Sequence, residues 1–275
     1  MVLESILNPK NILKKPLHMF FLAVIYTTIS IFFAWKIFPA AASILSLAFI
    51  TILFIPIFFK VFSKEEKKDR LYSSPIHPNL FFRHKDAIVL YTLFFLGIIV
   101  ASSFVYVFFP DIHAFDLQNN TLRSFVTGHV TGGGDGLCGS DNFSKYVCNN
   151  SQTMLLSFVL SLIFGAGAIF VLAWNASIIA VYLGGVMKSM IAAGTHPIQA
   201  YLFGIPMGLG AIALHGIPEI LAYFFAGIAG GILSIGIIRE KTLSKKFKNI
   251  FKDSIIFLVI AEVLIILAAY LEAAF

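Results

Sequence analysis

The sequence predicts an all-α polytopic membrane protein with about seven transmembrane helices. Hydrophobic residues make up 59% of the 275 positions and charged residues only 12%, well below the roughly 25% charged residues of soluble globular proteins. The apolar residues gather in runs of roughly twenty, the length that a helix needs to cross about 30 Å of hydrocarbon. Backbone groups in lipid must form hydrogen bonds within their own segment, so we expect these runs to be helices.

Seven spans can be drawn, and the fifth and sixth are two arms of one apolar stretch at residues 201–240. Pro206 interrupts the first arm, and the arms separate near residues 215–218, so we predict a broken helical hairpin over residues 201–238. The other five spans are predicted at residues 17–38, 41–61, 87–109, 154–172 and 255–274.

The distribution of basic residues predicts the orientation in the cell membrane. All twenty lysines and arginines except Lys36, Arg123 and Lys145 fall on one side of the predicted bundle. Basic residues accumulate in short cytoplasmic loops, so the amino terminus is expected in the cytoplasm and the carboxyl terminus outside. This bias accounts for the net charge of +6, and nucleic acid is not expected as a partner.

The lysines near the amino terminus precede an apolar run, as in a secretory signal. However, the run is too long and lacks a small-residue cleavage site, so we expect a retained first helix.

The predicted spans divide the chain into four parts. They are a cytoplasmic segment (1–16), three helices with a cytoplasmic loop at 62–86 (17–109), an extracytoplasmic loop (110–153) and a core of four helices (154–275).

Both cysteines of the chain, Cys138 and Cys148, lie in the predicted extracytoplasmic loop. A cysteine pair on the oxidising side of a membrane favours a disulfide bond. Metal binding by the pair is the alternative, but no second cysteine pair or group of histidines accompanies it. The sequence carries no motif that predicts a cofactor.

Three N-x-S/T sequons lie in the same predicted loop, at Asn119, Asn142 and Asn149. This tripeptide is the acceptor for N-linked glycans on the outer surface of proteins. We therefore treat the three asparagines as glycosylation candidates.

A charged run in the first cytoplasmic loop, from Glu65 to Arg70, matches the E-E-x-x-x-R pattern of intramembrane prenyl-protein proteases. That chemistry needs its paired glutamates inside a sheltered membrane cavity with histidine partners. The run is fully polar and lies outside every predicted span, so we reject the match.

Ionisable residues within the stretch 201–240 form the candidate polar core, because such residues are costly in lipid unless they are paired, hydrated or in use. Pro218 favours the start of a helix, which places Glu219 in the first turn of the sixth span, where the helix dipole stabilises a carboxylate. We expect His215 to hydrogen-bond this carboxylate or cap the helix. We expect Asn175, near the inner part of the fourth span, to bond to a neighbouring helix.

Glycines at close spacing flank the polar core. Small residues four positions apart let helix backbones approach closely. The four glycines are predicted either to pack helices within the chain or to form a contact between copies. They are Gly204, Gly208, Gly227 and Gly231.

Several segments together resemble the stage II sporulation protein M family, in particular its archaeal branch. The most specific is the HG-x-x-E element at His215, Gly216 and Glu219 with its glycine-rich continuation. The pair Asn149-Asn150 and the glycine-bearing fourth span also fit, and the likeness covers nearly the whole chain. The chain departs from the family's name-giving member by its cysteine-bearing loop and an additional amino-terminal hairpin.

The resemblance implies a membrane scaffold with partners. In sporulating bacteria the name-giving member works as a membrane anchor in a cell-wall-remodelling complex. An archaeal host has neither endospores nor the same wall, so we carry over the membrane fold and the HG-x-x-E element, not the sporulation role.

Three functions are therefore weighed. The first is an integral membrane scaffold that associates with itself or with other membrane proteins through its glycine-rich faces, with His215, Glu219 and Asn175 clamping the core helices. The second is transport of protons, ions or small solutes through the same polar core. The third is a metal-dependent intramembrane enzyme, which we do not expect because H-x-x-x-E supplies two of the three ligands that a catalytic zinc normally needs.

Overall fold

The computed structural model describes residues 15–71, 80–127, 141–241 and 244–274, and it confirms the all-helical fold. Seven of the helices in these segments are long and apolar enough to cross a membrane, which makes the chain a multi-pass membrane protein. The helices are α3 (Leu17–Ile37), the short η1 (Pro39–Ala41), α4 (Ala42–Leu71), α5 (Leu80–Phe108), α6 (Asp116–Thr127), α7 (Asn142–Phe164), α8 (Ala168–Ala192), α9 (Pro197–Arg239) and α10 (Lys245–Ala274).

The predicted fourth span at residues 154–172 is wrong, because two helices meet within it. The helix α7 ends at Gly165, whose φ of 73° is open to glycine at little steric cost. Gly167 follows, and a Cβ added there would lie 2.3 Å from the carbonyl oxygen of Leu160. These two glycines therefore allow a tight turn between α7 and α8 in the middle of an apolar run.

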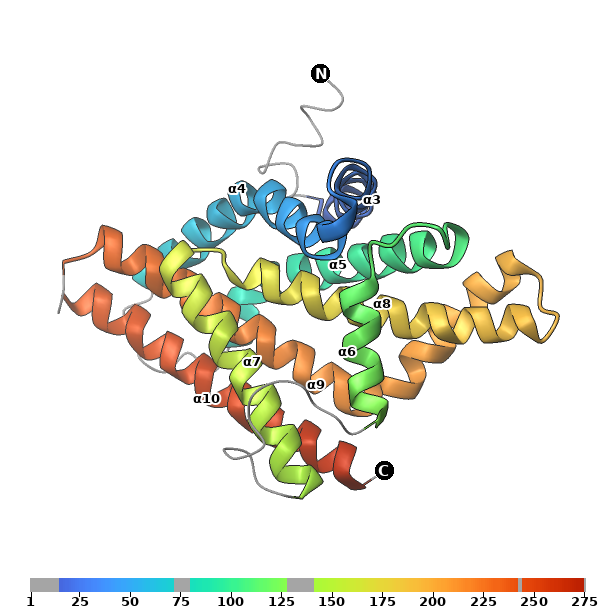
Figure 1. Cartoon of the computed structure of the whole chain (residues 1–275). Helices are drawn as coiled ribbons and strands as arrows, with labels where there is room; N and C mark the ends of the chain where they lie inside the picture. The colour runs from blue at the N-terminus through green and yellow to red at the C-terminus, as the bar shows by residue number, and fades with distance from the viewer. Residues whose placement is uncertain (1–14, 72–79, 128–140, 242–243, 275) are drawn as a thin grey trace.

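The predicted hairpin over residues 201–238 is also wrong, because α9 is one helix of 43 residues that contains both Pro206 and Pro218. A proline inside a helix removes one hydrogen bond and kinks the helix without necessarily ending it. Figure 1 shows α9 changing direction along its length below α8. One helix replaces two predicted spans here, and two helices replace one at α7 and α8, so the number of spans is unchanged.

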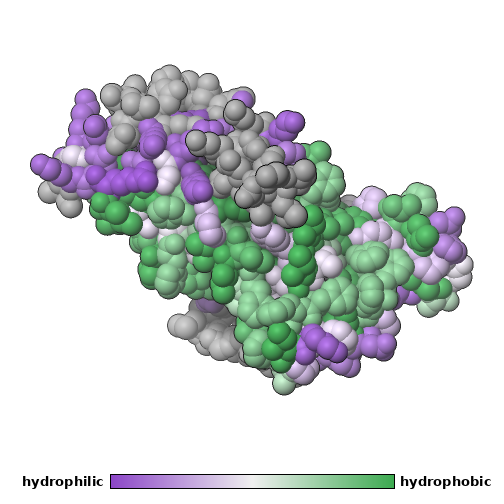
Figure 2. Space-filling view, turned by 90° about the horizontal axis from the view of Figure 1, so that it is seen from above, coloured by the Kyte–Doolittle hydropathy of each residue, from purple (hydrophilic) through white to green (hydrophobic). Residues whose placement is uncertain are grey.

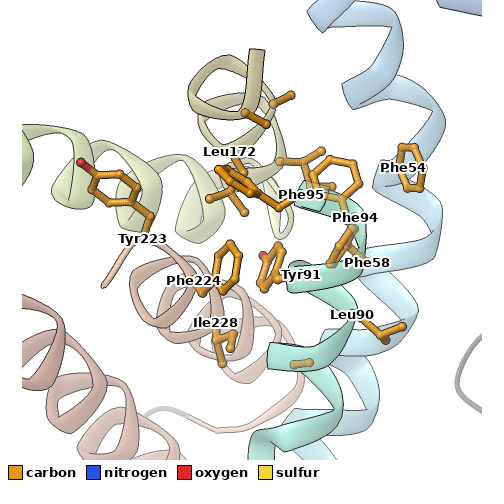
Figure 3. Close-up of a cluster of buried hydrophobic side chains, with 14 of the residues drawn as sticks. Phe54, Phe58, Leu90, Tyr91, Phe94, Phe95, Leu172, Tyr223, Phe224 and Ile228 are labelled. Carbon is orange, nitrogen blue, oxygen red and sulfur yellow. The ribbon is translucent and has the colours of Figure 1, made fainter. Parts of the chain in front are cut away.

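The core of the molecule lies where α4, α5, α8 and α9 meet. The ring of Tyr91 on α5 stacks between Phe58 of α4 and Phe224 of α9, with ring centroids 4.6 and 5.3 Å apart (Figure 3). All three rings are almost completely buried. On its other sides α9 packs against α7 and α10, so it is the central helix of the bundle.

The outward surface is apolar along the flanks of the bundle and polar at its ends. On α3 every fourth residue from Leu17 to Ile37 is about half exposed, as expected for a helix face in contact with lipid. Figure 2 shows hydrophobic surface over the middle of the molecule and hydrophilic surface towards its ends. This distribution supports association with a lipid bilayer.

The four glycines singled out in the sequence pack helices of this chain against each other. A Cβ added at Gly227 would lie 2.8 Å from the Cβ of Ala168 on α8, and one at Gly231 would lie 2.7 Å from the ring of Phe62 on α4. Gly204 and Gly208 meet Met187 and Leu183 of α8 in the same way. The contacts support the first alternative, packing within the chain, and association between copies stays a prediction.

Gly230 gives a direct test of this packing. A Cβ at this position would lie 2.4 Å from the carbonyl oxygen of Phe158, which belongs to the backbone of α7. We expect Gly230→Ala to lower the free energy of unfolding by about 1–3 kcal/mol, the usual effect of overpacking. Thermal unfolding in detergent measures it, with Gly210→Ala as the control because that glycine has open space around its Cβ position. Equal melting temperatures for the two variants would contradict the packing.

Candidate functional site

The first candidate site is a buried hydrogen-bonded group that joins α7 to α9, which we call the Asn150 cluster. The side-chain N–H of Asn150 donates to Oε1 of Glu219 at 2.5 Å, and the hydroxyl of Tyr223 donates to Oδ1 of Asn150 at 3.1 Å. Glu219 and Tyr223 are four residues apart on α9 and share one face of the helix. Asn150 and Tyr223 are 7% and 3% exposed, so the contact is largely shielded from solvent.

An amide is well suited to this position because it carries a donor and an acceptor on one planar group. Its N–H donates to the Glu219 carboxylate and its oxygen accepts from the Tyr223 hydroxyl, so the three polar groups are hydrogen-bonded to one another in apolar surroundings. The next residue extends the link, because the hydroxyl of Ser151 donates to Oε1 of Glu262 on α10 at 2.8 Å. Two consecutive residues of α7 therefore bind α9 and α10.

The predicted pairing of His215 with Glu219 is wrong. Within the described parts of the chain, His215 makes no hydrogen bond or ion pair with Glu219, whose partner is Asn150. His215 lies one turn earlier on α9 and is half-buried. Asn175 bonds within its own helix, donating to the carbonyl oxygen of Val171 at 2.8 Å. The three predicted residues therefore do not form one cluster, and only Glu219 belongs to the site.

The sequence prediction missed Asn150 because it began the fourth span at Met154. The helix instead starts at Asn142, where the side chain of Asp141 accepts a hydrogen bond from the backbone N–H of Ser144 at 2.9 Å. This bond holds the pKa of the Asp141 carboxyl below its ordinary value. An aspartate before a helix start is a recognisable cap signal, and it could have placed Asn150 inside α7.

The predicted extracytoplasmic loop at residues 110–153 therefore contains more helix than expected. It includes α6 and the first turns of α7, which carry the three candidate glycosylation sites. Asn142 and Asn149 are exposed on α7, whereas Asn119 on α6 is half-buried and accepts a hydrogen bond from the hydroxyl of Tyr106 at 2.9 Å. Glycosylation at these sites stays a prediction.

The predicted disulfide also stays a prediction, because Cys138 lies outside the described residues. Cys148 lies on α7, two residues before Asn150, and its Sγ accepts a hydrogen bond from the side chain of Gln152 at 3.4 Å. A bond to Cys148 would fix the preceding segment to the helix that carries the Asn150 cluster.

The second candidate site, the Glu65 cluster, lies where the ends of α4, α5 and α9 meet. Glu65 and Glu66 on α4 are fully buried. Oε2 of Glu65 lies 2.8 Å from Nδ1 of His84 on α5, and Oε2 of Glu66 lies 3.3 Å from the guanidinium of Arg239 on α9. Adjacent residues of one helix point in different directions, so the two carboxylates bind two different neighbouring helices.

The expectation that this charged run lies in a polar loop is wrong. The helix α4 continues ten residues beyond the predicted end of the second span, to Leu71, and carries both glutamates into the interior. A neighbouring ion pair extends the cluster to α10, because the guanidinium of Arg83 donates to Oδ2 of Asp253 at 2.7 Å. In the described segments, no three histidine, cysteine or acidic side chains come close enough to hold a metal ion.

Removing one partner of the Glu65 cluster should be costly, because it leaves the other charge buried. We expect His84→Ala to lower the free energy of unfolding by about 3–5 kcal/mol. A double-mutant cycle with Glu65→Gln measures the pair, and the double variant should lose less stability than the sum of the two single variants. Additive losses would contradict a direct interaction between Glu65 and His84.

The Asn150 cluster makes a similar prediction. Asn150→Leu removes both hydrogen bonds and leaves the Glu219 carboxyl and the Tyr223 hydroxyl without this partner, so we expect a loss of about 2–4 kcal/mol. The matched control is Asn142→Leu, which makes the same change at an exposed position of the same helix. Thermal unfolding measured by circular dichroism should separate the two variants, and similar melting temperatures would contradict the role of Asn150.

Comparison with known proteins identifies one family. The family model described as "Stage II sporulation protein M" matches residues 87–275, which include most of α5 and every later helix. No curated protein and no solved structure matches the chain. Asn150, Glu219 and Tyr223 all lie within the matched residues.

Proposed function

Because the chain belongs to the stage II sporulation protein M family, we propose that it is an integral membrane scaffold whose core is clamped by the Asn150 cluster. The observation that supports this most strongly is the use of the Asn150 amide. Its donor and its acceptor both bind residues of α9, so the group holds two helices in register. A scaffold needs such a fixed framework on which to present its surfaces to partners.

The distribution of the polar and close-packing contacts between helices also favours a scaffold. The Asn150 cluster joins α7 to α9 at the middle of α9, and the Glu65 cluster joins α4 to the last residue of α9. Between them, Gly227, Gly230 and Gly231 bring α9 into close contact with α8, α7 and α4. This packing supports a rigid body, and contacts with other proteins or with a second copy would use surfaces other than these glycines.

The proposed orientation places the amino terminus in the cytoplasm and the carboxyl terminus outside. With the corrected helices, Lys188 at the end of α8 is the one basic residue that changes sides. The contact between Arg239 and Glu66 supports this arrangement, because it places the end of α9 beside the end of α4 on the same side. The excess of basic residues on that side then follows the usual cytoplasmic bias.

Transport of protons or ions is the second candidate function, and the position of Glu219 favours it. This carboxyl group lies in the middle of a membrane-spanning helix and is only half-buried, with His215 one turn away. Ionisable residues at such positions are typical of proton and ion pathways. The two proposals make opposite predictions for vesicles that contain the protein.

Glu219→Gln separates the two functions, because glutamine can keep the hydrogen bond to Asn150 but cannot exchange a proton. For a scaffold, we expect wild-type vesicles to hold a proton gradient as long as protein-free vesicles, and we expect Glu219→Gln to change stability by less than about 1 kcal/mol. Glu219→Leu, which cannot form the hydrogen bond, is the control for stability and should unfold at a lower temperature. A gradient that wild-type protein dissipates and Glu219→Gln does not would establish transport instead.

A further inference from the structure

A group of exposed lysines lies where α9 turns into α10. Lys241 in the connection and Lys245, Lys246 and Lys248 in the first turn of α10 are all exposed. Figure 2 shows hydrophilic surface concentrated towards one end of the molecule, and Figure 1 places the α9–α10 connection at the left end of the bundle. We call these four lysines, with the exposed ring of Phe251, the α10 basic patch.

The position of the patch along α10 places it at the level of lipid headgroups. The helix has 30 residues and is therefore about 45 Å long, whereas the hydrocarbon layer is about 30 Å thick. The last twenty residues, from Ile255 to Ala274, are mostly apolar and are enough to cross that layer. The ten residues before them must then lie beyond the hydrocarbon, at the membrane surface.

The charges of the patch are not balanced within the described protein. Lys245, Lys246 and Lys248 form no ion pair with a described carboxylate, and the first turn of α10 contains no acidic residue. Positive side chains at the amino-terminal end of a helix add to the positive end of its dipole and are unfavourable there. An external anion that neutralises the patch would therefore stabilise the start of α10.

An aromatic pair within the patch fits the same surroundings. The rings of Phe247 and Phe251 are stacked with centroids 6.4 Å apart, and Phe251 is 47% exposed. An exposed aromatic ring between lysines is poorly placed against water but well placed at the boundary between headgroups and acyl chains. A free anion such as phosphate offers no contact for this ring, whereas a lipid offers both a phosphate and an acyl chain.

We propose that the α10 basic patch binds the phosphate headgroups of anionic phospholipids and so anchors the start of α10 at the membrane surface. Charge complementarity selects the headgroup, and the Phe247–Phe251 pair contacts the upper part of the acyl chain. The binding site is separate from the Asn150 cluster and does not depend on the scaffold function.

Native mass spectrometry of the detergent-purified protein tests the proposal, with phosphatidylglycerol and phosphatidylcholine as the lipids titrated. We expect wild type to bind phosphatidylglycerol more tightly, and we expect added salt to remove the difference because screening weakens surface charges. Lys245→Gln combined with Lys248→Gln should weaken phosphatidylglycerol binding roughly thirtyfold, the factor given by about 1 kcal/mol for each lysine.

The matched control changes two exposed lysines elsewhere on the surface, Lys36→Gln with Lys145→Gln, and should bind phosphatidylglycerol within about twofold of wild type. Equal binding of the two lipids by wild type overturns the proposal, as does an equal loss of affinity in the control variant. If the test variant fails to fold, Lys245→Arg with Lys248→Arg replaces it. That variant keeps the charge and should bind as wild type does, and a loss of lipid preference would overturn the proposal.

Discussion

A buried polar group in a membrane protein must find its partner within the protein, because the surrounding hydrocarbon offers none. The Asn150 amide meets this constraint for three groups at once by bonding to Glu219 and Tyr223. Both of its partners are on α9, so their positions determine how far α7 can shift along α9. The same register brings Gly230 of α9 against the backbone of α7, where an added Cβ would lie 2.4 Å from the carbonyl oxygen of Phe158.

The amino-terminal helices α3 and α4 precede the residues that the family model matches, which begin at residue 87 within α5. Their attachment uses two kinds of contact. Apolar and aromatic side chains of α4, such as Phe58, pack against Tyr91 in the interior, and Glu65 and Glu66 form ion pairs at the end of the helix. These contacts join α4 to the matched helices both in the interior and at the end of the helix.

Composition and the length of the apolar runs were sufficient to predict the helical membrane fold and the number of spans. They could not place the helix ends. An apolar run can contain a turn when it carries glycines such as Gly165 and Gly167. An apolar run with prolines such as Pro206 and Pro218 can still form one continuous, bent helix. Glu219 was recognised because a carboxylate in lipid needs an explanation. Its partner Asn150 was not, because the partner depends on where α7 begins and on how two distant helices pack.

The continuity of α9 has a mechanical consequence. Glu219 and Arg239 belong to the same helix and are twenty residues apart, or about 30 Å along its axis, so the Asn150 cluster and the Glu65 cluster hold one rod at two depths. A piston-like displacement of this rod would have to break both attachments together. If one cluster broke, the other would still hold α9 in place. The two clusters therefore oppose sliding of α9 along its axis, although the helix is bent.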